Sequence, residues 1–398
     1  MTRMKDSGIE WIGEIPEEWG IVRLKDCLEI NNGKDYKDIE TDETGYPVIG
    51  SGGQFAYARK YLHDGTAILL GRKGTIDKPL YIEGKFWTVD TMFYGVSKSG
   101  IHAKFIYYVA LQIPFGLYST NTALPSMTQT DLQNHHFAMP PLDEQTQIAD
   151  FLDKKVAQLD KVKSLLEEQI KTLEDYRQSL IYETVTKGLD KTVPLKDSGV
   201  DWIGQIPEGW EVKKHKYIMS KTKTLCSHYS GQKILSLTRQ GVISRDVESG
   251  KGKMPASFDG YQFLTRGDLL LCLFDIDVTP RCVGVVESDG LTSPAYSRFK
   301  VSEDSSAYYY YYLFLSMDDD KVLLHLAKNL RNSLTEDDFG DIETIVPSYK
   351  EQVIIANYLN KKTLLIDKLI KLKKEQIENI NKQRQTLIYD YVTGKRRV

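Results

Sequence analysis

Cysteine is scarce in this chain, and long apolar runs are missing. The 398 residues include four cysteines, none of them in a CxxC pair: Cys27, Cys226, Cys272 and Cys282. We expect free thiols in a reducing compartment, which argues against a disulfide-stabilised secreted protein. No apolar stretch approaches the ~20 residues that span a bilayer, and the opening MTRMKDSG lacks the apolar core of a signal peptide. We therefore expect a cytoplasmic protein.

Signatures of catalysis are also missing. The sequence contains no GxxxxGK[ST] phosphate loop, no HExxH, no GxSxG and no Asn-Pro-Pro-aromatic motif of amino-methyltransferases. Cys226 and His228 supply two ligands, which is fewer than a metal site needs. The pair His135-His136 has no matching acid or nucleophile pattern, so a structural role is favoured. We expect no catalytic residue, no metal site and no cofactor bound by this chain itself.

Basic residues are not in overall excess. Lys and Arg number 52 against 55 Asp and Glu, and the net charge of −3 argues against simple non-specific binding to nucleic acid. The charge is uneven, however, because residues 211–253 hold ten basic and three acidic side chains, a local excess of seven. The weak overall basicity predicts that a partner supplies part of any grip on phosphates.

What the sequence does have is an internal repeat. Lys5–Trp19 reads KDSGIEWIGEIPEEW and Lys196–Trp210 reads KDSGVDWIGQIPEGW, identical at eleven of fifteen positions with an offset of 191 residues. EQTQIADFLDKK from Glu144 is echoed by EQVIIANYLNKK from Glu351 at an offset of 207. The chain is therefore two tandem copies of one plan, and a duplicated plan suits a target with two-fold symmetry.

Each second signature begins a long helical pattern without Gly or Pro, over 143–187 and 350–393. Four to five apolar heptads favour a coiled coil of helices ~60 Å long. The expected helix-pairing positions are Leu152, Leu159, Leu166, Leu173 and Leu180 in the first helix, and Leu359, Ile366, Ile380 and Leu387 in the second. Two independent amphipathic helices are the alternative. Polar interruptions at Lys163, Arg177 and Lys373 favour antiparallel pairing of the two helices with each other.

The modules between these signatures, residues 20–140 and 211–346, are predicted to mix short strands with a short helix at 103–112 and at 307–316. Their ends correspond, but their interiors share little sequence. A common frame around divergent interiors is typical of two specificity modules for different targets.

Several polar and basic residues in Gly-rich, turn-like stretches are candidates for contact with DNA, since Arg reads guanine and Gln reads adenine in the major groove. For any single residue, solvated surface charge is an equal alternative. The candidates are Ser51, Gln54, Tyr57, Arg59, Lys60, Arg72, Lys73 and Thr75 in the first module, and Arg239, Gln240, Arg245, Lys251, Lys253, Arg281 and Arg331 in the second.

The WIGEIP-x-x-W openings, the PLDEQ and SYKEQ helix starts, and the LIYETVTKG and LIYDYVTGK helix ends resemble the specificity (S) subunit of type I restriction-modification systems. The resemblance covers essentially the whole chain. It implies an α+β fold in which two mixed, β-rich target recognition domains are joined by an antiparallel coiled coil with internal pseudo-two-fold symmetry. The implied parts are recognition domain 1 (1–142), the central helix (143–187), a linker with recognition domain 2 (188–348) and the C-terminal helix (349–398).

The resemblance further implies that each domain reads one half of a bipartite, asymmetric target in double-stranded DNA, while the helices set the spacer. Two methyltransferase subunits would dock on the chain and bind S-adenosylmethionine, and two endonuclease subunits that use ATP and Mg would complete the restriction enzyme. The chain itself would be non-catalytic. A subunit serving a methyltransferase alone is one alternative. Another is a non-enzymatic coiled-coil scaffold whose modules bind protein, which the acidic net charge supports.

The four tryptophans of the two openings also leave two readings. Trp is enriched at binding hot spots, so they are candidate partner anchors. We favour the second reading, in which Trp11, Trp19, Trp202 and Trp210 fasten each opening to its module.

Overall fold

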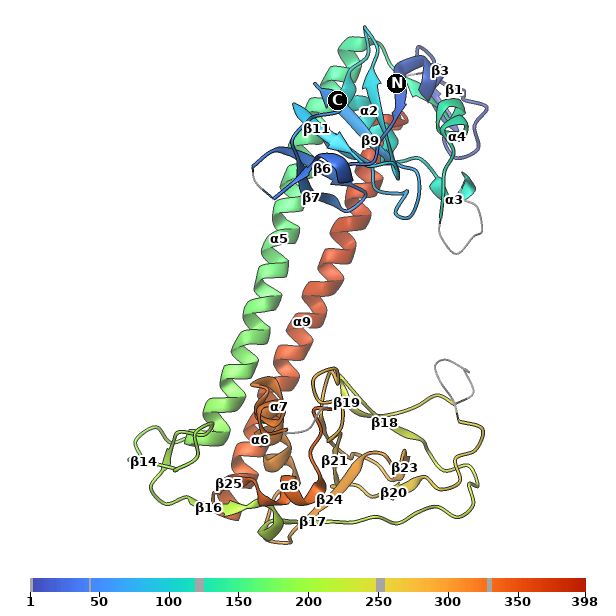
Figure 1. Ribbon diagram of the computed structural model, residues 1–398. Helices are drawn as coiled ribbons and strands as arrows, with labels where there is room; N and C mark the ends of the chain where they lie inside the picture. Colours follow the sequence, from blue (N-terminus) through green and yellow to red (C-terminus); the bar gives the residue numbers. More distant parts are fainter. Residues whose placement is uncertain (1–2, 43, 119–124, 248–254, 328–330) are drawn as a thin grey trace. The chain divides into compact units, whose positions relative to one another are not determined.

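The computed structural model describes residues 3–42, 44–118, 125–247, 255–327 and 331–398 (Figure 1). The chain divides into two units. Unit 1 comprises Met1–Glu167 and Lys374–Val398, and unit 2 comprises Glu168–Lys373. Both boundaries fall inside the long helices α5 (Leu142–Lys187) and α9 (Tyr349–Val392), so each unit contains a part of both helices.

Unit 1 contains two small strand pairs and two larger sheets. The pairs are β1–β2 and β3–β13, both antiparallel. One sheet is antiparallel in the order β10-β9-β12-β4, and the other runs β5-β7-β6-β11-β8 with β6 and β11 parallel. The bounds are β1 Met4–Asp6, β2 Glu14–Pro16, β3 Gly20–Arg23, β4 Leu28–Asn32, β5 Glu40–Thr41, β6 Tyr46–Gly50, β7 Gly53–Ala58, β8 His63–Asp64, β9 Ala67–Gly71, β10 Leu80–Ile82, β11 Lys85–Thr88, β12 Met92–Ser97 and β13 His136–Met139.

Strand β9 explains how unit 1 is layered. Its sequence AILLG is buried along its whole length, as expected for a strand covered on both faces. Successive side chains of a strand point to opposite faces. Ile68 and Leu70 accordingly join the core that contains α2, whereas Ala67 and Leu69 join the core under the β6–β11 sheet. The helical segments are α1 Leu24–Cys27, η1 Lys37–Ile39, α2 Ala103–Ala110, α3 Phe115–Tyr118 and α4 Gln129–Asn134.

Unit 2 repeats this frame with different additions. Its antiparallel sheet has the order β17-β24-β21-β22, and its small pairs are β14–β15, β16–β25, β18–β19 and β20–β23. The strand bounds are β14 Leu195–Asp197, β15 Gln205–Pro207, β16 Glu211–Lys214, β17 Met219–Lys221, β18 Leu235–Thr238, β19 Gly241–Ser244, β20 Gln262–Leu264, β21 Leu269–Leu271, β22 Val283–Val285, β23 Gly290–Thr292, β24 Ser297–Val301 and β25 Glu343–Val346. The helical segments are η2 His215–Tyr217, α6 Ala307–Asp319, α7 Val322–Leu326 and α8 Glu336–Asp341.

The two frames correspond element by element. The pairs β1–β2 and β3–β13 match β14–β15 and β16–β25, and the order β10-β9-β12-β4 matches β22-β21-β24-β17. Strand β21 is also covered on both faces, because Leu269 and Leu271 lie in one core and Leu270 in another. The short helices predicted at 103–112 and 307–316 are confirmed as α2 and α6. The predicted α+β class is confirmed as well.

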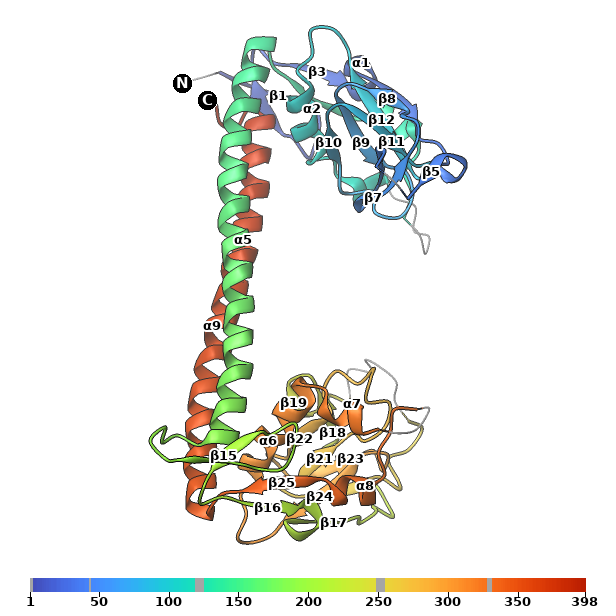
Figure 2. The same cartoon turned by 60° about the vertical axis from the view of Figure 1, so that its left-hand side comes forward.

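Within each unit, α5 and α9 lie side by side (Figures 1 and 2). In unit 1 the ring of Phe151 packs on that of Tyr391 at 4.6 Å, so the first turns of α5 lie against the last turns of α9. In unit 2 Arg177 Nη1 bonds Asp367 Oδ1 at 2.8 Å and Lys373 Nζ bonds Gln169 Oε1 at 2.6 Å. The helices are therefore antiparallel, and two of the polar residues that interrupt the heptads bond across them.

The structure places every predicted helix-pairing side chain at least partly out of solvent. Leu152 and Leu359 are fully buried and Ile366 is buried. The remaining six are half-buried: Leu159, Leu166, Leu173, Leu180, Ile380 and Leu387. Other apolar residues of α9 point outward, since Leu364, Leu365, Leu369 and Leu372 are 40–57% exposed.

Candidate nucleic-acid interface

The two signatures of each copy contact each other and fasten the β-rich part to its helix. Trp19 Nε1 donates to Glu144 Oε2 at 3.0 Å, and Trp210 Nε1 donates to Glu351 Oε1 at 3.2 Å. Both indoles are buried, with 0% and 2% exposed, so they fasten the openings and cannot anchor a partner. The following glutamine is used in the same way in both copies. Gln145 bonds the N–H of His102, and Gln352 bonds the N–H of Ser306.

The end of each helix holds the opening of one copy. In unit 1 the hydroxyl of Tyr389, near the end of α9, donates to the carbonyl of Trp11 at 3.0 Å. In unit 2 the hydroxyl of Tyr182, near the end of α5, donates to the carbonyl of Ile203 at 3.2 Å. Each β-rich part is therefore attached to both helices of its unit, and a rigid base carries the surfaces described next.

The first group of predicted contacts lies on the β6–β7 hairpin of unit 1. Ser51 stands in the turn, Gln54 and Tyr57 are exposed on β7, and Arg59 and Lys60 follow that strand, also exposed. The structure thus brings five of the candidates to one hairpin. Its edge presents amide, hydroxyl and guanidinium groups, which are the donors and acceptors that read base edges.

Sequence reasoning missed the aromatic side chains beside this hairpin. Phe55 is 56% exposed and meets Tyr36 edge-to-face at 5.3 Å, and Lys37 lies over the Tyr36 ring at 5.0 Å. Lys85 lies over the ring of Tyr61 at 4.9 Å. Exposed aromatics next to cations suit contact with bases and phosphates. The sequence offers one indication of these aromatics, since Phe55 directly follows the turn-like stretch GSGGQ.

The second group lies on another sheet, in the turn after β9. Arg72 Nη1 donates to the carbonyl of Asp90 at 3.3 Å, and its guanidinium lies 5.7 Å from the Phe93 ring. Lys73 and Thr75 are exposed in the same turn. Arg72 and Lys73 line a cavity of about 280 Å³. The candidates of the first module therefore form two groups rather than one surface.

In unit 2 the structure brings three candidates together. Arg239 and Gln240 form the turn between β18 and β19, Arg281 precedes β22, and all three line one cavity of about 340 Å³. Arg245 lies just after β19 and is half-buried, and Arg331 is exposed before α8. Lys251 and Lys253 fall outside the described residues, so that part of the prediction has no structural counterpart here.

The local positive excess counted over residues 211–253 is smaller in the fold than in the sequence. Lys214 and Lys216 bond Asp341 Oδ1 at 3.2 and 2.8 Å, and Lys221 bonds Glu336 Oε2 at 2.8 Å. The hydrogen bonds from Lys216 and Lys214 hold the pKa of Asp341 below its usual value. The sequence count missed this because the acids come from α8, more than a hundred residues away.

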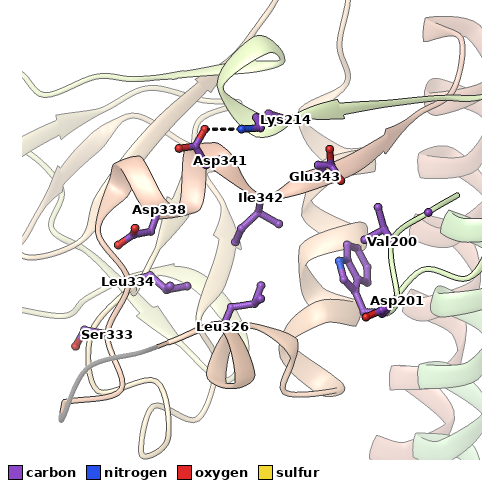
Figure 3. Close-up of a pocket in the computed structure, with 12 residues that line it drawn as sticks. Val200, Asp201, Lys214, Leu326, Ser333, Leu334, Asp338, Asp341, Ile342 and Glu343 are labelled. Carbon is purple, nitrogen blue, oxygen red and sulfur yellow. Dashed lines mark hydrogen bonds and ion pairs between the residues drawn. The ribbon is translucent and has the colours of Figure 1, made fainter.

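A larger cavity of about 710 Å³ lies beside the second opening (Figure 3). Trp202, Leu326 and Ile342 are among its apolar lining residues, and Asp338 and Asp341 are among the acids around it. Carboxylates repel phosphate, so this cavity does not suit the nucleic-acid backbone. In unit 1 the corresponding Trp11 instead stacks on His135 at 5.5 Å.

All four cysteines are buried and free of disulfides. Burial raises the pKa of Cys27 to about 11, which makes a thiolate nucleophile unfavourable near neutral pH. In the described part of the chain, no three His, Cys, Asp or Glu side chains are placed to hold a metal ion. Cys226 Sγ instead donates to the carbonyl of His228. Among the described helices, none has the length and apolarity to cross a membrane.

Comparisons with known proteins agree with this arrangement. Residues 16–174 match the family model of the type I restriction modification DNA specificity domain. The type I restriction enzyme MjaVIII specificity subunit of Methanocaldococcus jannaschii is 25% identical over 96% of this chain and 94% of its own length. A protein of the same organism, proposed to be the MjaX specificity subunit, is 25% identical over 97% of this chain and 96% of its own.

A chain from a solved type I R-M system, studied for its complex assembly and conformational transition, has the same fold. Its TM-score is 0.68 at 13% identity, covering 95% of this chain and 98% of that one. The sequence matches run along nearly the full length of this chain and of both relatives. Over nearly its whole length, this chain is similar to the specificity subunits of type I restriction enzymes.

Proposed function

We propose that this chain selects the DNA sequence on which a type I restriction-modification complex acts. Unit 1 reads one half of a bipartite target and unit 2 reads the other. The candidate contacts of unit 1 lie on the β6–β7 hairpin and the turn after β9, and those of unit 2 lie around the β18–β19 turn.

One observation carries this proposal: the two units share their frame and differ in the parts that carry the candidate contacts. The mixed sheet with the β6–β7 hairpin belongs to unit 1, and the β18–β19 and β20–β23 pairs belong to unit 2. A shared frame with two different surfaces fits a target whose halves have different sequences. It follows that the recognised DNA is asymmetric.

The long helices are proposed to set the number of base pairs between the halves. Two ion pairs link α5 with α9 at equivalent positions of the repeat, Arg177 with Asp367 in unit 2 and Arg384 with Asp160 in unit 1. Each member of the second pair is 207 residues from its counterpart, the offset of the helix signatures. Ion pairs at fixed positions oppose sliding of one helix along the other, which supports a fixed spacer.

Partner subunits are proposed to supply the chemistry. Methyltransferase subunits would bind S-adenosylmethionine and methylate adenine, and endonuclease subunits, where present, would use ATP and Mg. The outward-facing Leu364, Leu365, Leu369 and Leu372 of α9 give such a subunit an apolar face to cover. This chain would then act by placing its partners on DNA.

The test is to co-express the chain with the methyltransferase encoded beside it and to map N6-methyladenine across the host genome by long-read sequencing. The proposal predicts one motif made of two different halves with a fixed gap. A stable complex that leaves no motif would contradict it and would favour the scaffold that binds protein.

A further inference from the structure

The cavity behind the β18–β19 turn gathers arginines from three distant segments of unit 2. Arg177 comes from α5, Arg239 from the turn, and Arg281 from the segment before β22. Gln240 and Tyr311 also line this space of about 340 Å³. The heptad pattern marks Arg177 only as an interruption, so nothing in the sequence connects it with the other two.

The arginines that line this cavity carry more positive charge than the neighbouring carboxylates neutralise. Arg177 bonds Asp367, while Arg281 Nη1 donates to the hydroxyl of Tyr311 at 3.4 Å. Within the described residues, no carboxylate forms an ion pair with Arg239 or Arg281. The charges of Arg281 and Arg177 also act on Asp319, whose pKa is raised by burial although both arginines lower it.

Unit 1 has an equivalent of the Arg177–Asp367 ion pair but no equivalents of the other two arginines. The pair Arg384–Asp160, at 3.3 Å, occupies the positions equivalent to Arg177–Asp367. The position equivalent to Arg281, two residues before the strand β10, holds the exposed Lys78. Because unit 1 pairs its helices without arginines corresponding to Arg239 and Arg281, helix pairing does not account for these two side chains.

We propose that Arg177, Arg239 and Arg281 hold one backbone phosphate of duplex DNA. This inference rests on the proposed function and names a contact within it. A guanidinium group presents two parallel N–H donors to a phosphate, and three such groups surround one anion readily. The hydroxyl of Tyr311 accepts from Arg281, which leaves its own proton to donate to the phosphate.

A phosphate contact at this place would position unit 2 without reading sequence. Backbone contacts fix the register and orientation of a protein on the duplex, while base-edge contacts provide specificity. Because Arg177 belongs to α5, the phosphate would be held by the helix and by the β-rich part at once. The surface of unit 2 that contacts this half-site would then be joined directly to α5, one of the helices proposed to set the spacer.

The test uses the full chain in complex with its methyltransferase subunits. Arg239→Ala and Arg281→Ala are chosen because neither side chain pairs α5 with α9. The dissociation constant is measured for the cognate duplex and for an unrelated duplex over a range of KCl concentrations. We expect each variant to bind both duplexes about tenfold more weakly than the wild type does. The slope of log Kd against log salt should fall by about 0.9 for the lost phosphate contact. The methylated motif should not change.

Methylphosphonate scanning locates the contact. Duplexes carrying one neutral methylphosphonate at successive positions should lose affinity for the wild type at one or two adjacent sites. Arg281→Ala should lose nothing further there, because the two changes remove the same contact. Arg384→Ala, which removes the equivalent ion pair of unit 1, is the matched control and should still lose affinity at those sites.

Three results would overturn the inference. One is an unchanged salt slope in both arginine variants. Another is a changed base preference, which would make these arginines base readers. The third is binding of inorganic phosphate to the wild type but not to Arg281→Ala while no methylphosphonate position couples, which would make the cavity a free-anion site. A wild type that yields a bipartite motif in any of these cases leaves the proposed function standing.

Discussion

At the scale of single residues, one backbone hydrogen bond recurs in both units, and a buried histidine supplies its acceptor in unit 1 and its donor in unit 2. The N–H of Leu24 bonds the carbonyl of His135 at 2.9 Å, and the equivalent N–H of His215 bonds the carbonyl of Ile342 at 3.0 Å. Burial lowers the pKa of His215 to about 3 and that of His135 to about 4. Both imidazoles are therefore neutral near pH 7, and neither can act as a proton carrier there.

Their burial predicts a loss of stability in mild acid. The unfolded His215 binds a proton below pH 6.5, whereas the folded one binds it only near pH 3, so the free energy of unfolding falls as the pH drops through this window. The expected slope is about 1.4 kcal/mol per pH unit per histidine. Urea unfolding of unit 2 at pH 7.5, 6.0 and 5.0 measures it.

The variant His215→Leu tests the assignment, since leucine fills the equivalent position 24 of unit 1. It should be less stable at pH 7.5, because the carbonyl of Phe339 loses the imidazole and keeps only the N–H of Ile342, yet its stability should depend less on pH. His228→Gln, at an exposed site, should behave as the wild type. Equal pH dependence of His215→Leu and wild type would refute the explanation.

At the scale of elements, each long helix is followed within two residues by a glycine that lies close to an opening. Gly188 follows α5 with φ +70 and Gly394 follows α9 with φ +73, the left-handed conformation common after helix C-termini. A Cβ at Gly188 would meet the Trp210 ring at 3.3 Å, and one at Gly394 would collide with Pro16 and Trp19. The two glycines occupy equivalent positions, but Gly394 has the closer contact with its opening.

We expect Gly394→Ala to destabilise unit 1 more than Gly188→Ala destabilises unit 2. The left-handed conformation costs an alanine roughly 1–2 kcal/mol at either place. At position 188 the Trp210 ring need yield only a few tenths of an ångström, whereas position 394 requires a larger displacement of the Pro16 ring. Urea unfolding monitored by tryptophan fluorescence compares the two variants. A larger loss in Gly188→Ala would show that the close contact at Pro16 is not limiting.

The elements also show what a sequence can and cannot predict. The helices and their pairing positions were predictable because a heptad is a local pattern, and the signatures were predictable because they recur. The ion pairs of Lys214, Lys216 and Lys221 with α8 were not, since they join segments far apart in sequence. For the same reason the heptad pattern marks Arg177 only as an interruption, although this side chain lines the cavity with Arg239 and Arg281.

At the scale of the whole molecule, the duplication is built into the contacts. Tyr389 of the second copy holds the opening of the first, and Tyr182 of the first copy holds the opening of the second. Neither unit is made from a single copy of the repeat, because each uses parts of both long helices. Each proposed half-site reader therefore depends on both copies of the repeat.

Shortening both helices should shorten the spacer. Deletion of one heptad from the Leu152–Leu180 row, with the facing heptad of α9, removes about 10 Å of helix. At ~3.4 Å per base pair, the gap should lose about three base pairs while the bases of both halves stay the same. Mapping of methylated adenines measures this. Altered bases around an unchanged gap would show that the helices do not set the distance.

Each unit is proposed to read its own half of the target. The most direct measurement is the methylated-adenine map of Gln54→Ala/Tyr57→Ala/Arg59→Ala, compared with that of the wild type under the same expression. We expect bases in one half to become degenerate while the other half and the gap are retained. Changes in both halves, a changed gap or an unaltered motif would contradict it.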